Sequence, residues 1–255
     1  MKPYVIPAAL VFGLISCTYN DVAPIAADAL PVREVSYNLD GTVSWIKTFT
    51  YDDQRRKIRE YREPVNISST EKTDINYQFD SEGHLIKRTE AIDGVIYFVA
   101  EYVYENNLLK SEATNYPNST GDSRRRTEYF YSGNLVDSVV GFAAGMEPKG
   151  VAHPYEYDDQ ERLINDGAQT FTYDESDRVI SACNIYYNEC YETEYNSAGQ
   201  ISKYYLAYNF DEPKRYLMDE YIYVNGRLEE KRSYNYFYLL GPAPGPDIFI
   251  KKYEY

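Results

Sequence analysis

The side chains that could act as an acid, a base or a nucleophile are few and widely spaced in this chain of 255 residues. Its two histidines are His84, in the segment FDSEGHL, and His153, which precedes Pro154. Neither has a serine or cysteine neighbour in a motif such as the strained elbow of hydrolases. We therefore interpret His84 as a variant of a repeated turn and His153 as an exposed loop residue.

Pairs of acidic residues raise a second catalytic option, because two carboxylates that flank a sugar linkage can hydrolyse it. These pairs recur at one position of a repeated segment, so turn formation accounts for them without catalysis. The same turns lack the full ligand spacing of a calcium loop, and the dispersed glycines form no phosphate-binding loop. We predict no enzyme activity, no cofactor and no metal site; the pairs are Asp52 with Asp53, Asp158 with Asp159, and Glu175 with Asp177.

The cysteines point to export rather than to chemistry. Cys183 and Cys190 lie in VISACNIYYNECYETEY, which has the pattern of two strands around a short connection. Residues seven apart can face each other across such a hairpin, within reach of a disulfide. We predict this disulfide, which would suit an oxidising compartment. Two unpaired thiols packed as small apolar groups are the alternative.

The N-terminus has the layout of a secretory signal. Residues 1–16 contain Lys2, an apolar run too short to span a bilayer, and a small residue before Cys17. The segment LISC, Leu14 to Cys17, resembles the lipobox of bacterial lipoproteins, which implies cleavage before Cys17 and lipid attachment to it. An ordinary signal peptide with an incidental cysteine is the alternative. Thr18 favours the outer membrane, with periplasmic-facing and cell-surface orientations both open.

A tyrosine-rich motif organises the rest of the chain, which holds 30 Tyr. Residues 17–32 have the composition of a tether behind a lipidated cysteine, and residues 33–255 form the predicted domain. In this domain two aromatic residues at i and i+2 are followed by an acidic or amide residue, a polar turn and an aliphatic residue. A short copy, YEY, ends the chain, and the longer copies start at Tyr37, Phe49, Tyr77, Tyr102, Tyr129, Tyr155, Phe171, Thr193 and Tyr221.

The spacing within the motif predicts hairpins. Aromatic residues at i and i+2 lie on one face of a strand, and Asp, Asn, Gly and Ser suit the tight turn that follows. With further turn signals between the motifs, the chain reads as an all-β antiparallel meander of about 18 short strands without helices. We expect a curled, barrel-like sheet in which Val32 to Tyr37 pairs with Tyr253 to Tyr255; an open spiral or solenoid of hairpins is the alternative. Charged residues on the non-aromatic face argue against a membrane-spanning barrel.

The motifs resemble the YD repeat of the Rhs family, above all YDDQERL at Tyr157 and FDSEGHL at Phe79. They also resemble a group of Bacteroidetes lipoproteins of unknown function with a porin-like fold. The resemblance covers about residues 33 to 255, but this sequence has no long repeat array and no C-terminal toxin domain. It implies a structural role and contact with carbohydrate or protein, not a catalytic site.

These observations predict a non-catalytic lipoprotein of the cell envelope, anchored in the outer membrane through Cys17. A net charge of −14 argues against nucleic acid as a partner. We expect a binding or interaction module for a glycan or an envelope protein. A purely structural or assembly role is one alternative, and a carbohydrate-active enzyme is another. Exposed aromatics that break the repeat and cluster in one cleft would favour binding, as would the long loops at Gly141 to Pro154 and Gly241 to Asp247.

Overall fold

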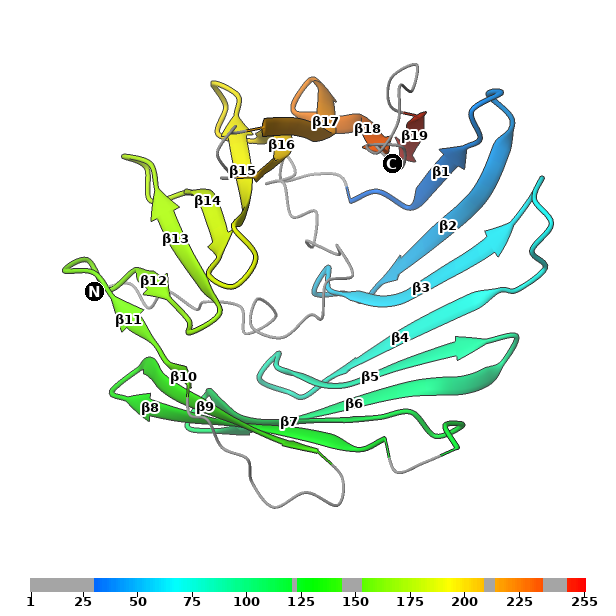
Figure 1. Ribbon diagram of the computed structural model, residues 1–255. Coiled ribbons are helices and arrows are strands. Elements are labelled where there is room, and N and C mark those ends of the chain that lie inside the picture. The colour runs from blue at the N-terminus through cyan, green and yellow to red at the C-terminus, as the bar shows by residue number, and fades with distance from the viewer. Residues whose placement is uncertain (1–29, 121–122, 144–152, 209–213, 236–246) are drawn as a thin grey trace.

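The computed structural model describes residues 30–120, 123–143, 153–208, 214–235 and 247–255. These residues form one sheet of antiparallel strands (Figure 1), and no helix occurs among them, so none in the described ranges is long and apolar enough to cross a membrane. The predicted fold class is confirmed. The strands are β1 (Arg33–Tyr37), β2 (Val43–Tyr51), β3 (Lys57–Pro64), β4 (Thr73–Phe79), β5 (Leu85–Ile92), β6 (Val95–Glu105), β7 (Leu108–Asn115), β8 (Arg125–Ser132), β9 (Leu135–Ala143), β10 (His153–Pro154), β11 (Glu156–Tyr157), β12 (Leu163–Asn165), β13 (Gln169–Tyr173), β14 (Val179–Asn184), β15 (Glu189–Tyr195), β16 (Ile201–Tyr208), β17 (Lys214–Val224), β18 (Arg227–Asn235) and β19 (Asp247–Glu254).

The sheet curls until its first and last strands meet. β1 pairs antiparallel with β19, from Arg33 opposite Glu254 to Tyr37 opposite Ile250. This pairing confirms the barrel-like sheet and argues against the open spiral. The sheet is nearly closed, and its pairing is shortest on the far side, where β9–β10 and β11–β12 each pair over two positions and β12–β13 over one. β10 and β11 are two halves of one extended stretch, which brings the strand number to the predicted value of about 18.

A β-bulge recurs in the motif hairpins. In β2 and β3, Thr50 lies opposite Arg59 but Tyr51 lies opposite Lys57, so the returning strand contains one extra residue, Ile58. Because bulges bend a strand and increase its twist, their repetition helps the sheet to close. The same shift places an extra residue at Ile86, Lys110, Asp137, Ile164, Ile180, Ser202 and Glu229.

The acidic residue of the motif holds its own turn. Oδ1 of Asp174 accepts hydrogen bonds from the backbone N–H groups of Ser176 (2.9 Å) and Arg178 (3.0 Å), and Oδ2 accepts one from Nε of Arg178 (2.7 Å). Asp177 has a φ of 60°, and Gly199 fills the equivalent place in a later turn at 79°. This arrangement, termed the turn clamp below, recurs as Asp52 with Arg56, Asp80 with His84, Asp158 with Arg162 and, with an amide pair, Asn196 with Gln200.

Each clamp is also linked to the next hairpin. The guanidinium of Arg178 lies 4.3 Å from the ring centroid of Tyr195, and the hydroxyl of Tyr195 donates to the carbonyl oxygen of Val179 (2.8 Å). Tyr131 and Tyr157 donate in the same way to Leu109 (2.7 Å) and Val136 (2.9 Å). The second aromatic of the motif therefore couples consecutive repeats, which explains why it is so often Tyr.

The up-and-down path of the chain gives the sheet two different ends. One end, the motif rim, contains Pro31, Tyr255 and the turns at residues 52–56, 80–84, 106–107, 133–134, 158–162, 174–178, 196–200 and 225–226. The other end, the opposite rim, contains the turns at residues 38–42, 65–72, 93–94, 166–168 and 185–188.

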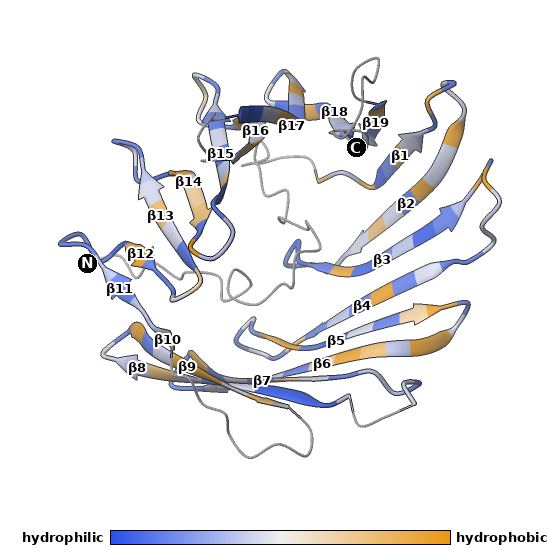
Figure 2. Cartoon of the chain, viewed as in Figure 1, coloured by the Kyte–Doolittle hydropathy of each residue, from blue (hydrophilic) through white to orange (hydrophobic). Residues whose placement is uncertain are grey.

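The two faces of the sheet also differ. The face that carries the aromatic doublets, the motif face, contains a small core of Leu109, Tyr129 and Val139, and Tyr129 is only 2% exposed. Val103 and Phe130, which lie between doublet residues and so point to the other face, are 56% and 42% exposed. Side chains converge on the concave side of a closed sheet, so the motif face is the concave one. Figure 2 shows that hydrophobic and hydrophilic residues alternate around the whole sheet.

Candidate functional site

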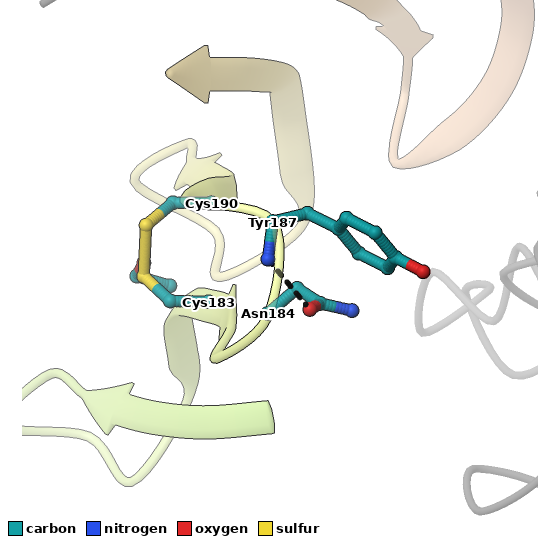
Figure 3. The surroundings of a disulfide bond; sticks show 5 residues. Cys183, Asn184, Tyr187 and Cys190 are labelled. Atoms are coloured by element: carbon teal, nitrogen blue, oxygen red, sulfur yellow. Dashed lines mark hydrogen bonds between the residues drawn. A yellow bond between two sulfur atoms is a disulfide. The ribbon is translucent and has the colours of Figure 1, made fainter. Parts of the chain in front are cut away.

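The hairpin of β14 and β15 departs most clearly from the repeat. Cys183 lies directly opposite Cys190, and a disulfide joins them with an S–S distance of 2.14 Å (Figure 3). The turn between them, at residues 185–188, lies on the opposite rim and contains Ile185, Tyr186 and Tyr187. We term residues 183–190 the stapled tip.

Side-chain and backbone hydrogen bonds fix the conformation of the stapled tip. The side-chain oxygen Oδ1 of Asn184 accepts from the backbone N–H groups of Tyr186 (2.9 Å) and Tyr187 (3.2 Å). Asn188 adopts a φ of 54°, which asparagine tolerates better than most residues. Figure 3 shows the ring of Tyr187 extending away from the sulfur atoms. The covalent bond and these polar contacts hold a turn that has no turn clamp.

The neighbouring turn at residues 166–168 supports the tip from one side. The N–H of Ile185 donates to the carbonyl oxygen of Ala168 (3.0 Å), and the hydroxyl of Tyr186 donates to the carbonyl oxygen of Gly167 (3.1 Å). The rings themselves face solvent, since Tyr186 is 64% exposed and Tyr187 is 63% exposed. Their position is thus fixed while their surfaces stay available for contact.

Other exposed apolar side chains gather on the same rim. Tyr116 follows β7 and packs edge-on against Phe98, with ring centroids 5.3 Å apart. The amide of Asn118 donates to the carbonyl oxygen of Ile96 (2.8 Å), so this part of the rim is also held in place. Within the described ranges, the exposed large apolar residues at the turns or strand ends of the opposite rim are Leu39, Val65, Val95, Ile96, Tyr116, Ile185, Tyr186, Tyr187, Ile248 and Phe249.

His84 lies on the motif rim and replaces the arginine of a turn clamp. Its Nδ1 is 2.9 Å from Oδ2 of Asp80, and its ring stacks on Tyr104 with centroids 4.5 Å apart. The hollow beside it has a volume of about 440 Å³ and is lined by clamp and turn residues, among them Glu82 and Asn106. Since arginines make the same clamp and stacking contacts in other repeats, folding accounts for this histidine.

Two of the three acidic pairs play the same structural part, and in the third Asp177 forms an ion pair with Arg162 (2.8 Å). Asp52 and Asp158 are clamp residues, while their neighbours Asp53 and Asp159 are exposed. The backbone N–H and the guanidinium of Arg162 lower the pKa of Asp158, which suits a hydrogen-bond acceptor rather than a general acid. Within the described ranges, no group of three His, Cys, Asp or Glu side chains is arranged to hold a metal ion.

Several predicted features lie outside the described residues. These are Cys17 with the whole signal segment, and most of the two long loops. The ends of those loops belong to strands instead: Gly141 to Ala143 complete β9, Pro154 ends β10 and Asp247 begins β19. The backbone of His153 pairs with Val139 in the sheet, which corrects its assignment to a loop.

Sequence reasoning missed the exposed tyrosines of the stapled tip. Tyr186 and Tyr187 stand within the segment that suggested the disulfide, between Asn184 and Asn188. A usable signal was present, because three large apolar residues follow one another there without the alternation that a strand requires. Such a run in a turn places apolar surface in solvent.

Comparisons with known proteins give only distant likenesses. No protein-family model and no curated protein matches the sequence. Among solved structures, a Tc holotoxin pore of Photorhabdus luminescens is 12% identical with a TM-score of 0.42, over 78% of this chain but only 12% of the toxin chain. A porin-like protein of Bacteroides uniformis is 7% identical with a TM-score of 0.48, over 91% of this chain and 98% of that chain. The function is therefore argued from the geometry of this chain.

Proposed function

We propose that this protein is a non-catalytic binding module of the cell envelope and that its ligand contacts the opposite rim at the stapled tip. The observation that carries the proposal is the exposure of Tyr186 and Tyr187, at 64% and 63%, in a turn closed by a disulfide. The repeated tyrosines elsewhere are half-buried and couple hairpins. The hydroxyl of Tyr186 does reach Gly167 of the neighbouring turn, but both rings stay largely in solvent, so folding does not account for their exposed surfaces.

A rigid aromatic tip is well suited to recognition. Tyrosine offers a large contact area with few rotatable bonds, so little entropy is lost when it is immobilised. Its ring can stack on a sugar or an apolar side chain, and its hydroxyl can form a hydrogen bond. Because Asn184 and the disulfide fix the backbone in advance, binding does not have to order the loop. A glycan or an envelope protein fits this surface.

The path of the chain supports an anchor on the other side of the molecule. The N–H of Val32 donates to the carbonyl oxygen of Glu254 (2.8 Å), and the hydroxyl of Tyr51 donates to the carbonyl oxygen of Pro31 (2.9 Å). Both hydrogen bonds lie on the motif rim. Lipid attached to Cys17 would therefore lead into the motif rim. In an outer-membrane lipoprotein this geometry leaves the stapled tip at the end away from the anchor.

Binding screens with a paired variant test the proposal. The full-length chain with Cys17→Ser would be applied to a glycan array and used to capture envelope proteins. We expect the double variant Tyr186→Ala/Tyr187→Ala to lower the affinity for any captured ligand by about tenfold or more, which is the effect of losing one anchoring contact. Phe130→Ala, which removes a 42% exposed ring from the convex face, is the control. The proposal would be contradicted if the double variant bound the ligand as tightly as the wild type does. It would also be contradicted if the control variant lost as much affinity as the double variant.

The coupling between repeats favours a structural or assembly role as the second candidate. The hydroxyl groups of Tyr131 and Tyr157 donate hydrogen bonds to the preceding hairpin, so they are not available to donate to a ligand. If neither screen finds a ligand at high protein concentration, this second candidate stands.

A further inference from the structure

A cationic group lies on the motif face where β18, β19, β1, β2 and β3 run side by side. Lys231 on β18 lies directly opposite Lys251 on β19. Lys251 in turn lies opposite Ser36 on β1, and Ser36 lies opposite Trp45 on β2, so these four residues form one row across the strands. In the next row Lys47 is directly across from Arg62. Residues opposite one another on neighbouring strands share a face, so all these side chains project from the concave wall.

The ion pairs beneath this group leave positive charge in excess. Lys47 and Lys251 both approach Glu34, at 3.8 and 3.4 Å, and Glu34 is only 6% exposed. Lys47 and Lys57 share Glu60, at 2.9 and 3.0 Å. The connected set thus contains three lysines and two carboxylates before Arg62 is added, and Lys231 pairs separately with Asp219 (3.3 Å). Such a cationic patch stands out in a chain whose net charge is −14.

Arg62 adds a further charge that the described part of the chain does not pair. Its guanidinium carbon lies 3.7 Å from the ring centroid of Trp45, and no described carboxylate is within ion-pair distance. Burial lowers the pKa of Arg62, while the more distant Glu34 and Glu60 act in the opposite direction. Its neighbour Arg59, by contrast, makes two hydrogen bonds to Asp74, at 2.9 and 2.7 Å.

Stacking on Trp45 prepares Arg62 for a particular kind of partner. A guanidinium held close over an aromatic ring is restricted in its movement and can still offer N–H groups to a ligand. The edge of a guanidinium matches the two oxygens of a carboxylate, which it can bind with two parallel hydrogen bonds. Lys47 and Lys251 would add attraction at longer range.

We propose that the concave wall around Arg62, Trp45, Lys47 and Lys251 binds a carboxylate-bearing ligand, with Arg62 making the paired contact. This site is separate from the stapled tip and does not depend on the function proposed for it. Acidic sugars and non-sugar organic acids share this chemistry, and the test distinguishes them.

Trp45 is the one tryptophan of the chain, so its fluorescence reports on this site directly. The full-length chain with Cys17→Ser would be titrated with trigalacturonate, with tricarballylate and with maltotriose, which has no carboxylate. We expect a saturable change in emission with trigalacturonate and none with maltotriose. An equal response to tricarballylate would assign the site to carboxylates in general, and a weaker one to acidic sugars.

Matched arginine variants decide whether Arg62 is responsible. Arg62→Gln should weaken binding of trigalacturonate about tenfold or more, the scale of a lost charge-assisted pair of hydrogen bonds. Arg59→Gln, on the same strand but the other face, should leave it unchanged. Calorimetry measures the affinity independently, because Arg62→Gln also alters the surroundings of Trp45. The inference is overturned if neither carboxylate probe binds, if maltotriose binds as well, or if both variants lose binding equally. Tyr186→Ala/Tyr187→Ala should have no effect here, which separates this site from the stapled tip.

Discussion

The motif rim and the stapled tip hold their turns by different means. On the motif rim, turn clamps such as Asp174 with Arg178 fix five of the eight turns internally, and a tyrosine or phenylalanine from the next hairpin covers the arginine of the clamps that contain one. On the opposite rim, the stapled tip uses a disulfide and contacts to one neighbouring turn. Among the residues that the structure describes, four of the five large apolar side chains that are more than half exposed lie on the opposite rim: Leu39, Val95, Tyr186 and Tyr187.

This difference separates residues that folding requires from those that it does not. A residue type that recurs at one motif position, with the same contacts each time, is explained by the fold. A side chain that stands outside the repeat and projects into solvent is not. Repetition therefore removes His84 and the acidic pairs from the list of candidate sites, and the break in the repeat adds Tyr186 and Tyr187.

The largest expected contrast is between a ring in the concave wall and a ring in the stapled tip. Tyr129→Ala should lower the free energy of unfolding by about 3–5 kcal/mol, because it removes a nearly buried aromatic side chain. Tyr187→Ala should change it by less than about 0.5 kcal/mol, as is usual at an exposed site. Urea denaturation measures both, and similar losses would show that the tip is part of the core.

Removing the disulfide tests how the opposite rim is held. Cys183→Ser/Cys190→Ser should destabilise the protein by about 2.5 kcal/mol, the entropic value for so short a loop. Thiol titration of the unfolded, unreduced wild-type protein should find no reactive pair. Two reactive thiols would reject the bridge and favour the alternative of packed, unpaired cysteines.

A smaller effect is expected from single hydroxyl groups of the wall. Tyr131→Phe should cost about 1 kcal/mol, because it removes the hydrogen bond to the carbonyl oxygen of Leu109. Tyr129→Phe should be neutral or stabilising, since its buried hydroxyl has no hydrogen-bond partner among the described residues. Denaturant midpoints of the two variants, compared directly, measure the coupling between repeats. Equal losses would contradict that coupling.

Acid should loosen the motif rim gradually. The side chain and backbone N–H of Arg178 lower the pKa of Asp174, and the backbone N–H of Arg162, followed by its side chain, lowers that of Asp158. A carboxyl group whose pKa is lower in the folded state stabilises the protein above its unfolded pKa of about 3.9, and that stability is lost as pH falls through the folded pKa.

Urea midpoints measured from pH 6 down to pH 2.5 check this prediction. The double variant Asp158→Asn/Asp174→Asn should lose less stability than the wild type over the acid part of this range. Parallel curves for the two proteins would mean that the clamps do not contribute to the pH dependence.

Much of the architecture could be predicted because the motif is local. Aromatics at i and i+2 followed by turn residues specify a hairpin within about ten residues, and alternation assigns the rings to one face. The pairing of Val32 to Tyr37 with the C-terminal YEY followed from the need to cover two strand edges. The disulfide between Cys183 and Cys190 was expected from the same hairpin geometry.

Only the tertiary structure decided which motif residues make contacts with the next repeat and which surfaces remain exposed. The clamp arginines find their second partner, and the tyrosine hydroxyls their carbonyl acceptors, only across strands of the next repeat. Lys47 and Arg62 meet within one hairpin, but Lys251 joins them because the last strand returns to the first, a contact between residues about 200 positions apart. Sequence spacing determines local hydrogen bonds and alternation, whereas closure of the sheet determines how charges and rings from distant strands accumulate on its concave wall.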